Sequence, residues 1–340
     1  MTTVVTANEY NNVNTQQKEI NIEASKHIEL DEAILAALPS GTNVVAVTPS
    51  GASAWAHSVC LETRLADGVK KLYFLKASSG HSASGGCDLA RRMFEGSFES
   101  ESLLHRYLPN YVPKPHAWGS YSSPQAPNTW YYLCDFHDLV DEVPALDQFV
   151  SVIASLHNDS LGKEQRYGFH VPTHLANIPN NNEWQDTWEA FFKQLMERMM
   201  QVEADAHPPD DEFEGLKQDF MAKVLPRLLR PLETGGRSIQ PCLIHSNLWP
   251  GNCMLDADSD DVIVFDSCAY WGHNEADLGS WRAPRYRLGK PYIKQYQRTI
   301  SISEPEADWD DRNALYAMRY DLLVSALYPG TSYGLKFREL

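Results

Sequence analysis

One stretch of the chain, residues 243–271, constrains the fold more than any other. It begins at the end of an apolar strand, continues as a polar loop that ends on Asn252, and closes with a hairpin whose second arm, residues 262–265, leads directly to Asp266. An amide oxygen and a carboxylate oxygen therefore stand at the ends of two consecutive segments. Hard oxygen ligands of this type are the ones that Mg²⁺ prefers in proteins. The stretch predicts a cation site made by Asn252 and Asp266.

The polar loop also carries a family resemblance. Its residues 245–252, HSNLWPGN, are similar to the pattern H-G-D-L-W-x-G-N of the fructosamine kinase family, in particular its fungal protein-ribulosamine 3-kinase-like members. Each short match alone is weak, but many follow one another in the right order over most of the chain. The other matching stretches are SGASAW, YFLKASSG, VPKPHAWGSY, FVSVIASLH, YGFHVPT, TWEAFF, FDSCAYWGHNEADLGSWR and SEPEADWDDRNALYAMRYDLLVSALYPG.

The resemblance implies an α+β fold, namely the bilobal protein-kinase-like fold of aminoglycoside phosphotransferases and choline kinases. We expect a flexible arm over residues 1–20, an N-lobe with an antiparallel five-stranded sheet over 21–138, and a helical C-lobe over 139–340. Hydrophobic periodicity indicates the elements themselves. It predicts strands at 43–48, 57–65, 72–76, 117–121 and 130–134, and helices at 22–38, 87–107, 146–157, 187–202, 213–229 and 315–327.

The resemblance also implies ATP and Mg²⁺ as cofactors, with Asn252 and Asp266 holding the metal. Lys76 follows four apolar strand residues, which is where a kinase-fold lysine pairs with the α- and β-phosphates. A hairpin tip would meet phosphate through backbone N–H groups, and a hinge between the lobes would offer backbone groups to adenine. The residues expected at the tip and the hinge are Ser50, Gly51, Ser53, Asp135 and His137.

The base position of the loop departs from the family pattern. Asn247 stands where the family has the aspartate that takes or orients the proton of the acceptor hydroxyl. An amide has no useful basicity at neutral pH. Loss of a general base costs about 10²- to 10⁴-fold in rate. The substitution therefore predicts that phosphoryl transfer is slow, whereas the positioning of the reactants is kept.

A second departure falls in the helix expected over residues 87–107. Ser97 stands where the family has the glutamate that orients the strand lysine. Glu95 and Glu99 lack its helical phase, because two residues turn a side chain by about 200° around the helix. Glu101 has the phase but lies about 6 Å further along the axis. We expect all three glutamates on a solvated helix face.

The acceptor side of the site is expected near the loop. Its supply of aromatic residues predicts a small-molecule pocket bordered by Asn247, Trp249 and His273, although buried packing also explains each aromatic residue. His245 begins the loop and is expected to be a structural histidine that is hydrogen-bonded to backbone rather than a proton carrier. The resemblance of residues 272–278 to G-H-x-E-x-(E/D)-L implies carboxylates that brace this segment. The catalytic candidates are Asn247, His245, Trp249 and His273.

Composition excludes several classes of partner. The net charge of -16 leaves no basic stripe for nucleic acid or an anionic membrane. The chain has no run of about 18 apolar residues and no basic N-terminal region before an apolar core. Six cysteines without a C-x-x-C motif indicate reduced thiols. We expect a cytoplasmic monomer or dimer that acts on a small molecule, either a sugar-amine or a diverged metabolite.

Three functions remain open. The two departures favour a small-molecule enzyme redeployed on a kinase fold, with ordinary phosphotransfer weakened or lost. The first alternative is an active ATP-dependent ketosamine 3-kinase with a rewired base. The second is a non-catalytic pseudokinase that serves as a platform for a partner. Because one fold can host many functions, the family resemblance does not decide between these three, and the geometry of the site is needed.

Overall fold

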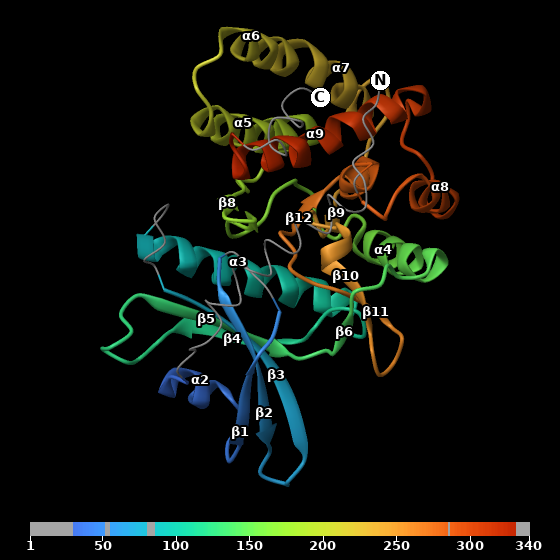
Figure 1. Cartoon of the computed structure of the whole chain (residues 1–340). Helices are drawn as coiled ribbons and strands as arrows, with labels where there is room; N and C mark the ends of the chain where they lie inside the picture. Colours follow the sequence, from blue (N-terminus) through green and yellow to red (C-terminus); the bar gives the residue numbers. More distant parts are fainter. Residues whose placement is uncertain (1–29, 52–54, 80–85, 285, 331–340) are drawn as a thin grey trace. The chain divides into compact units, whose positions relative to one another are not determined.

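The computed structural model describes residues 30–51, 55–79, 86–284 and 286–330 (Figure 1). The arm predicted over residues 1–20 and Ser53 at the hairpin tip lie outside these ranges. The described chain forms two compact units. Unit 1 holds the residues up to Glu142 together with Met254–Asp266, and unit 2 holds Val143–Cys253 and the residues from Ser267 onward. Contacts thus assign Met254–Asp266 to unit 1, whereas the sequence placed this segment within 139–340.

Unit 1 is built on a five-stranded sheet in the order β1-β2-β3-β5-β4. Every neighbouring pair is antiparallel, which confirms the predicted sheet. The strands run close to the ranges that periodicity indicated. They are β1 (Asn43–Pro49), β2 (His57–Arg64), β3 (Lys70–Ser79), β4 (Pro115–Ser120) and β5 (Thr129–Asp135).

The two faces of this sheet are covered by different helices, because successive strand residues point to opposite faces. Leu75 of β3 packs with Ile34 of the short helix α2 (Glu32–Ala37) in one apolar cluster. On the opposite face, Tyr132 of β5 packs with Phe94 of the long helix α3 (Gly86–Tyr107). Lys76 follows Leu75 and lies directly across from Tyr132 in the β3–β5 ladder. Lys76 therefore belongs to the face that α3 covers.

A hairpin from later in the chain completes unit 1. Strands β10 (Cys253–Asp256) and β11 (Val262–Val264) form a small sheet with β6 (Leu139–Val140) in the order β11-β10-β6. The N–H of Val264 donates to the carbonyl oxygen of Tyr111, just after α3, at 2.8 Å. This bond ties the end of β11 to the α3 region, so that Asp266 enters unit 1.

Unit 2 is mainly helical, and its site loop lies on a pair of short strands. Strands β9 (Cys242–Ile244) and β12 (Tyr270–Gly272) pair antiparallel, and β7 (His174–Leu175) pairs with β8 (Ile178–Pro179). The helices are α4 (Leu146–Ser160), α5 (Trp188–Ala206), α6 (Asp211–Asp219), α7 (Leu225–Leu229), α8 (Lys290–Thr299) and α9 (Trp309–Leu327), with a 3₁₀ segment η4 (Asn274–Arg282).

Helix α5 forms the core of unit 2, as its apolar stripe predicts. It begins at Thr187, whose side chain accepts a hydrogen bond from the N–H of Ala190. Trp188 is fully buried, and its indole N–H donates to the hydroxyl of Tyr316 in α9 at 2.9 Å. The residues of the predicted stripe are buried except Val202, which is partly buried; the buried ones are Trp188, Phe191, Phe192, Leu195, Met196 and Met199.

The helix predicted over residues 213–229 is present as an uninterrupted helical run, but its hydrogen-bond register changes part-way along. Helix α6 ends at Asp219, a π-helical turn covers Phe220–Val224, and α7 begins at Leu225. Pro226 is the physical reason, since proline has no N–H to donate and its ring clashes with the carbonyl four residues earlier. The N–H of Leu225 donates to the carbonyl of Phe220, five residues back, which is the π register.

The structure also describes most of the cysteines and the apolar character of the helices. Cys60, Cys134, Cys242, Cys253 and Cys268, the cysteines whose side chains are described, are buried and free. Within the described ranges, no helix has the length and apolar character needed to cross a membrane.

Candidate active site

An ion pair between Lys76 and Asp266 joins two residues that are 190 positions apart in the chain. The Lys76 ammonium lies 2.5 Å from Oδ1 of Asp266, and their side chains are 23% and 46% exposed. Burial alone would lower the pKa of Lys76, but the Asp266 carboxylate reverses this effect and the pKa is raised above its usual value. Lys76 therefore remains a cation, next to a carboxylate that solvent reaches. Both residues belong to unit 1.

Glu101 corrects the expectation of a solvated helix face. Its side chain is 3% exposed, on the side of α3 that faces the sheet. Burial first and then the charge of Glu101 raise the pKa of the Cys134 thiol to about 12, and the same charge helps to raise the pKa of Lys76. Ser97 is only half-buried. A carboxylate is therefore present near Lys76, one helical turn after the position where the family pattern has it.

The predicted hinge residues form local ion pairs within unit 1. Asp135 accepts a hydrogen bond from Nε2 of His116 at 2.7 Å and pairs with Lys71 at 2.9 Å. Burial would raise the pKa of Asp135, but these two partners lower it to about 2. His137 bonds through Nδ1 to Asp256 at 2.8 Å. These pairs hold the start of the connector to unit 2, and adenine recognition by its backbone stays a prediction.

The hairpin tip is described only in part. The N–H of Ser50 donates to the carbonyl of Ser58 at 3.1 Å, so it belongs to the β1–β2 ladder. Gly51 adopts the left-handed region with φ of 74°, which glycine adopts without strain. Because Ser53 lies outside the described residues, phosphate binding by this tip stays a prediction.

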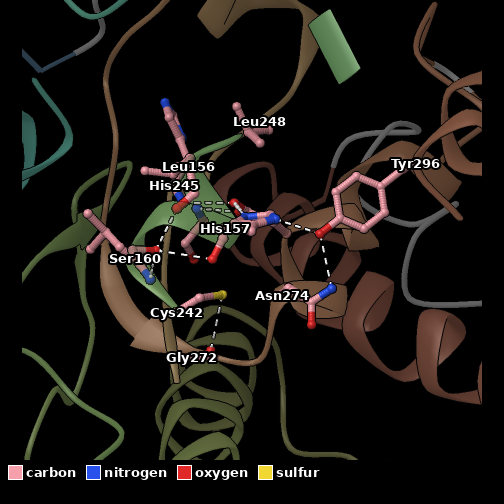
Figure 2. Close-up of polar contacts among 12 residues, drawn as sticks. Leu156, His157, Ser160, Cys242, His245, Leu248, Gly272, Asn274 and Tyr296 are labelled. Carbon is pink, nitrogen blue, oxygen red and sulfur yellow. Dashed lines mark hydrogen bonds and ion pairs between the residues drawn. The ribbon is translucent and has the colours of Figure 1, made fainter. Parts of the chain in front are cut away.

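In unit 2, Asp277 anchors the beginning of the loop. This carboxylate is fully buried and accepts hydrogen bonds from the backbone N–H groups of His245 at 2.8 Å and Ser246 at 2.5 Å, and from Nε2 of His157 at 3.1 Å. Figure 2 shows His157 between the loop and Tyr296, whose hydroxyl bonds to Nδ1 of His157 at 2.6 Å. The expected bracing role is thus visible in Asp277.

The other expected brace, Glu275, serves a different pair of segments. Its carboxylate pairs with the buried guanidinium of Arg312 in α9, with Oε2 at 2.9 Å from Nε, and accepts from the N–H of Ser303. Arg312 also donates to the backbone carbonyls of Ser303 and Pro305. Glu275 therefore fixes the segment before α9, and Asp277 fixes the loop.

Ser246 occupies the position at which the family pattern has glycine, and it adopts a left-handed φ of 62°. This conformation costs a non-glycine residue about 1–2 kcal/mol. Buried partners hold it in place: Arg319 donates to its hydroxyl at 3.0 Å, and the Tyr320 hydroxyl donates to its carbonyl at 3.1 Å. Arg319 also donates to Oδ1 of Asn180 at 2.7 Å.

The carbonyl groups that follow Ser246 are also held by hydrogen bonds. The carbonyl of Asn247 accepts from the Nδ2 of Asn252 at 3.0 Å. That of Leu248 accepts from the Ser280 hydroxyl at 2.8 Å and the Trp281 indole at 3.0 Å. The loop backbone is therefore fixed independently of the side chain at position 247.

The loop side chains differ in their access to solvent. His245 is fully buried, and its Nδ1 accepts the N–H of Asn247 at 3.2 Å, which favours the expected structural role. Asn247 and Trp249 are partly exposed. The Trp249 ring lies so close over Gly251 that a methyl group built there would come within 2.2 Å of it. Of this set, Asn247 and Trp249 remain able to meet a reactant.

His273 lies in the core of unit 2. It is 1% exposed, and its ring nitrogens bond to the hydroxyls of Tyr316 at 2.9 Å and Ser303 at 2.8 Å. Burial lowers its pKa to about 4. This geometry favours a structural histidine rather than the predicted border of a substrate pocket.

The metal prediction fits the residue types present. Among the described residues, no group of three or more His, Cys, Asp or Glu side chains could hold a metal ion. Mg²⁺ bound with a nucleotide does not need such a group, because it uses one or two carboxylates with phosphate and water oxygens. The exposed carboxylate of Asp266 suits this role, as does the amide oxygen of Asn252, whose Nδ2 is already used. Since these residues belong to different units, a shared cation stays a prediction.

The family follows from a comparison with known proteins. A family model described as fructosamine kinase matches residues 54–339. The chain belongs to the fructosamine kinase family. It is similar to the chloroplastic protein-ribulosamine 3-kinase of Arabidopsis thaliana, with 25% identity over 233 residues that cover 68% of this chain and 65% of that protein. Matches to its first curated relatives in this family span only 46% to 65% of their lengths.

Solved structures confirm the fold class. A protein described as a fructosamine-3-kinase from Thermobifida fusca superposes with a TM-score of 0.64 at 22% identity, over 88% of this chain and 92% of that one. The aminoglycoside phosphotransferase APH(4)-Ia, in a ternary complex with AMP-PNP and hygromycin B, gives a TM-score of 0.55 at 14% identity, over 88% and 91%. The predicted aminoglycoside phosphotransferase-like fold is therefore confirmed.

Two buried charges, Glu101 in unit 1 and Arg319 in unit 2, were not predicted from the sequence. Glu101 lies seven residues after Phe94 and three before Leu104, so a charge interrupts an apolar helical stripe. Arg319 likewise follows Tyr316 by three residues in α9. A charge on the buried stripe of an amphipathic helix needs a partner, because an unpaired buried charge is very costly. This signal was available in the sequence.

Proposed function

We propose that this chain binds ATP through unit 1 and slowly transfers its terminal phosphoryl group to a hydroxyl of a ketosamine. The observation that carries the proposal is the ion pair of Lys76 and Asp266, because it brings together a cation of the kind that pairs with phosphate and a carboxylate of the kind that holds Mg²⁺. The family supports the reaction class, since relatives carry the names protein-ribulosamine 3-kinase and ketosamine-3-kinase.

The chain's own residues would divide the chemistry between them. Lys76 would neutralise phosphate oxygens, and Asp266, with Asn252, would hold Mg²⁺. The metal supplies charge neutralisation at the transferred group. Asn247 would contact the acceptor hydroxyl through its amide oxygen, which can orient the proton but cannot take it. As the phosphoryl group passes to the hydroxyl oxygen, ADP would leave and the hydroxyl proton would pass to solvent water. Transfer would therefore lack general-base assistance and run about 10²- to 10⁴-fold below an enzyme with aspartate at this position.

Nucleotide binding is the first test. ATP with Mg²⁺ at 100 times its Kd would stabilise the protein by about 2.7 kcal/mol, which raises the melting temperature by several degrees. We expect Lys76→Met to abolish this rise. Lys70→Met is the matched control, because Lys70 lies on the same strand but pairs with Glu62 at the surface. An unchanged melting temperature for the wild-type protein at millimolar ATP and Mg²⁺ would contradict the proposal.

Substitution of the loop amide tests the transfer step. Asn247→Asp restores a carboxylate of the same shape on a backbone that other residues hold. We expect it to raise ATP-dependent phosphorylation of a ribulosamine or fructosamine about 10²-fold. Asn181→Asp, which adds the same charge at an exposed position of unit 2, should leave the rate unchanged. No gain in Asn247→Asp would mean that transfer to a ketosamine is not the reaction.

A second candidate is an enzyme redeployed to other small-molecule chemistry. The observation that favours it is the amide at position 247 within a loop whose anchors, Asp277 and Arg319, are otherwise intact. A protein that only binds a partner would have no need for this fixed loop. Wild-type protein that binds ATP, with no gain from Asn247→Asp, would favour this candidate over the slow kinase.

A further inference from the structure

In unit 1, the Lys76 side chain and helix α3 lie on the same face of the sheet. In the β3–β5 ladder, Phe74 lies opposite Cys134 and Lys76 lies opposite Tyr132, so these four side chains share one face. Phe94 of α3 packs on Tyr132 and Cys134. The Lys76 side chain therefore rises from the face on which α3 lies.

Glu101 lies on the stripe of α3 that contacts this face. Phe94, Ser97, Glu101 and Leu104 are spaced by three and four residues, which places them on one side of the helix. Phe94, Glu101 and Leu104 are 4%, 3% and 0% exposed. Side chains of a helix point back toward its N-terminus, so Glu101 covers surface over the preceding turn, which is the turn of Ser97.

The carboxylate also has an electrostatic reason to be there. A buried ionised group requires a counter-charge. Burial has the largest effect on the pKa values of Lys76, Tyr132 and Cys134, and the charge of Glu101 is a smaller influence that raises all three. Asp266 balances Lys76 in this structure. When Asp266 holds a cation, Lys76 needs a second acidic partner to keep its position, and Glu101 is buried on the helix that covers it.

We propose that Glu101 is the positioning residue for Lys76, taking over from the adjacent turn of α3 the task for which Ser97 has no carboxylate. This inference rests on the proposed nucleotide site. It treats the change at Ser97 as a displacement of the acidic partner by one turn rather than as its loss. Of the two departures at expected catalytic positions, Ser97 and Asn247, the one at Asn247 then remains.

The first test measures nucleotide affinity and folding separately. We expect Glu101→Gln to raise the Kd for ATP with Mg²⁺ about tenfold or more by calorimetry. The matched control, Glu99→Gln, removes a charge two residues away on a different side of α3 and should leave the Kd unchanged. The double variant Glu101→Gln, Ser97→Glu returns the carboxylate to the other turn of the same stripe, and we expect it to restore most of the affinity.

Rescue distinguishes positioning from mere support of the fold, because a carboxylate at position 97 cannot replace the packing of Glu101. An unchanged Kd in Glu101→Gln would overturn the inference. So would a weakened Kd that Ser97→Glu fails to restore in a variant whose urea unfolding matches that of the wild type.

The second test needs no nucleotide, so its result does not depend on the proposed function. In a crystal structure of Asp266→Asn, which removes the present partner of Lys76, we expect the Lys76 ammonium to move to the Glu101 carboxylate. In Asp266→Asn with Glu101→Gln the ammonium should lose that position, and in Asp266→Asn with Glu99→Gln it should keep it. A Lys76 ammonium that lies away from Glu101 in Asp266→Asn would overturn the inference, whereas absence of ATP binding in the wild type would overturn the function.

Discussion

Replacing Asp277 by asparagine should loosen the loop that carries Asn247. Asp277 is fully buried, and its two oxygens accept three hydrogen bonds, from the N–H groups of His245 and Ser246 and from His157. An amide can place its oxygen on the side of His245 and His157 and keep two of these bonds in a weaker, neutral form. Its NH₂ group then faces the N–H of Ser246, donor against donor.

The expected loss follows from these three bonds. A hydrogen bond to a charged group contributes about 1.5–3 kcal/mol, and a neutral one about 0.5–1.5 kcal/mol. One bond is lost, two are weakened, and a buried donor loses its acceptor. We therefore expect Asp277→Asn to lower the free energy of unfolding by about 3–5 kcal/mol, as when one partner of a buried charge network is removed.

Urea unfolding followed by tryptophan fluorescence measures this change, and hydrogen exchange of the His245 and Ser246 amides locates it. The matched control is Asp186→Asn, because Asp186 makes an ion pair with Arg166 at 2.7 Å but is 85% exposed. Such a pair contributes at most about 1 kcal/mol. A loss below about 1 kcal/mol in Asp277→Asn, with both loop amides still protected, would refute the assigned anchoring role.

The remaining predictions concern unit 2. His273 has a folded pKa of about 4 against a usual value of 6.5, so its contribution to stability is complete above about pH 6.5 and is lost as pH falls toward 4; about 3 kcal/mol should disappear over this window. Urea unfolding at a series of pH values should show that His273→Gln loses less unfolding free energy in acid than the wild type does. Equal losses in the two proteins would contradict this prediction. Gly279→Ala would bring a methyl group within 2.7 Å of the Tyr316 backbone and should lower the melting temperature, by the equivalent of about 3 kcal/mol. Gly215→Ala, where nothing lies within 4 Å, should instead stabilise α6 by up to about 1 kcal/mol, and equal effects of the two changes would refute the close approach.

Much of the fold could be predicted, because apolar residues recur with different spacings in strands and in helices. The strands of unit 1 and helices α3, α4 and α5 follow their predicted ranges closely. The change of register between α6 and α7 was missed, although Pro226 was visible. The helical spacing of apolar residues continues through Pro226. This spacing alone does not show that the proline lacks the backbone N–H that a regular α-helix needs.

The site could be predicted only as residue types. The sequence located the lysine within β3, the amide at position 247 and the aspartate after β11, and it indicated no base at position 247. It could not show that Lys76 and Asp266 lie 2.5 Å apart, because that distance depends on a hairpin attached to unit 1 through Val264 and Tyr111. The functional roles of these residues stay predictions for the experiments above.

The sequence by itself determined the chemistry that position 247 can offer, since the pKa range of an amide does not depend on the fold. It also determined the family resemblance and most of the secondary structure, because both depend on the order of residues along the chain. Tertiary structure alone decided that Glu101 is buried against the sheet and that Asp277 holds the loop. The physical reason is that the burial and the partners of a charge depend on which distant segments pack around it, and these set its pKa and its energetic cost far more than its neighbours in sequence do.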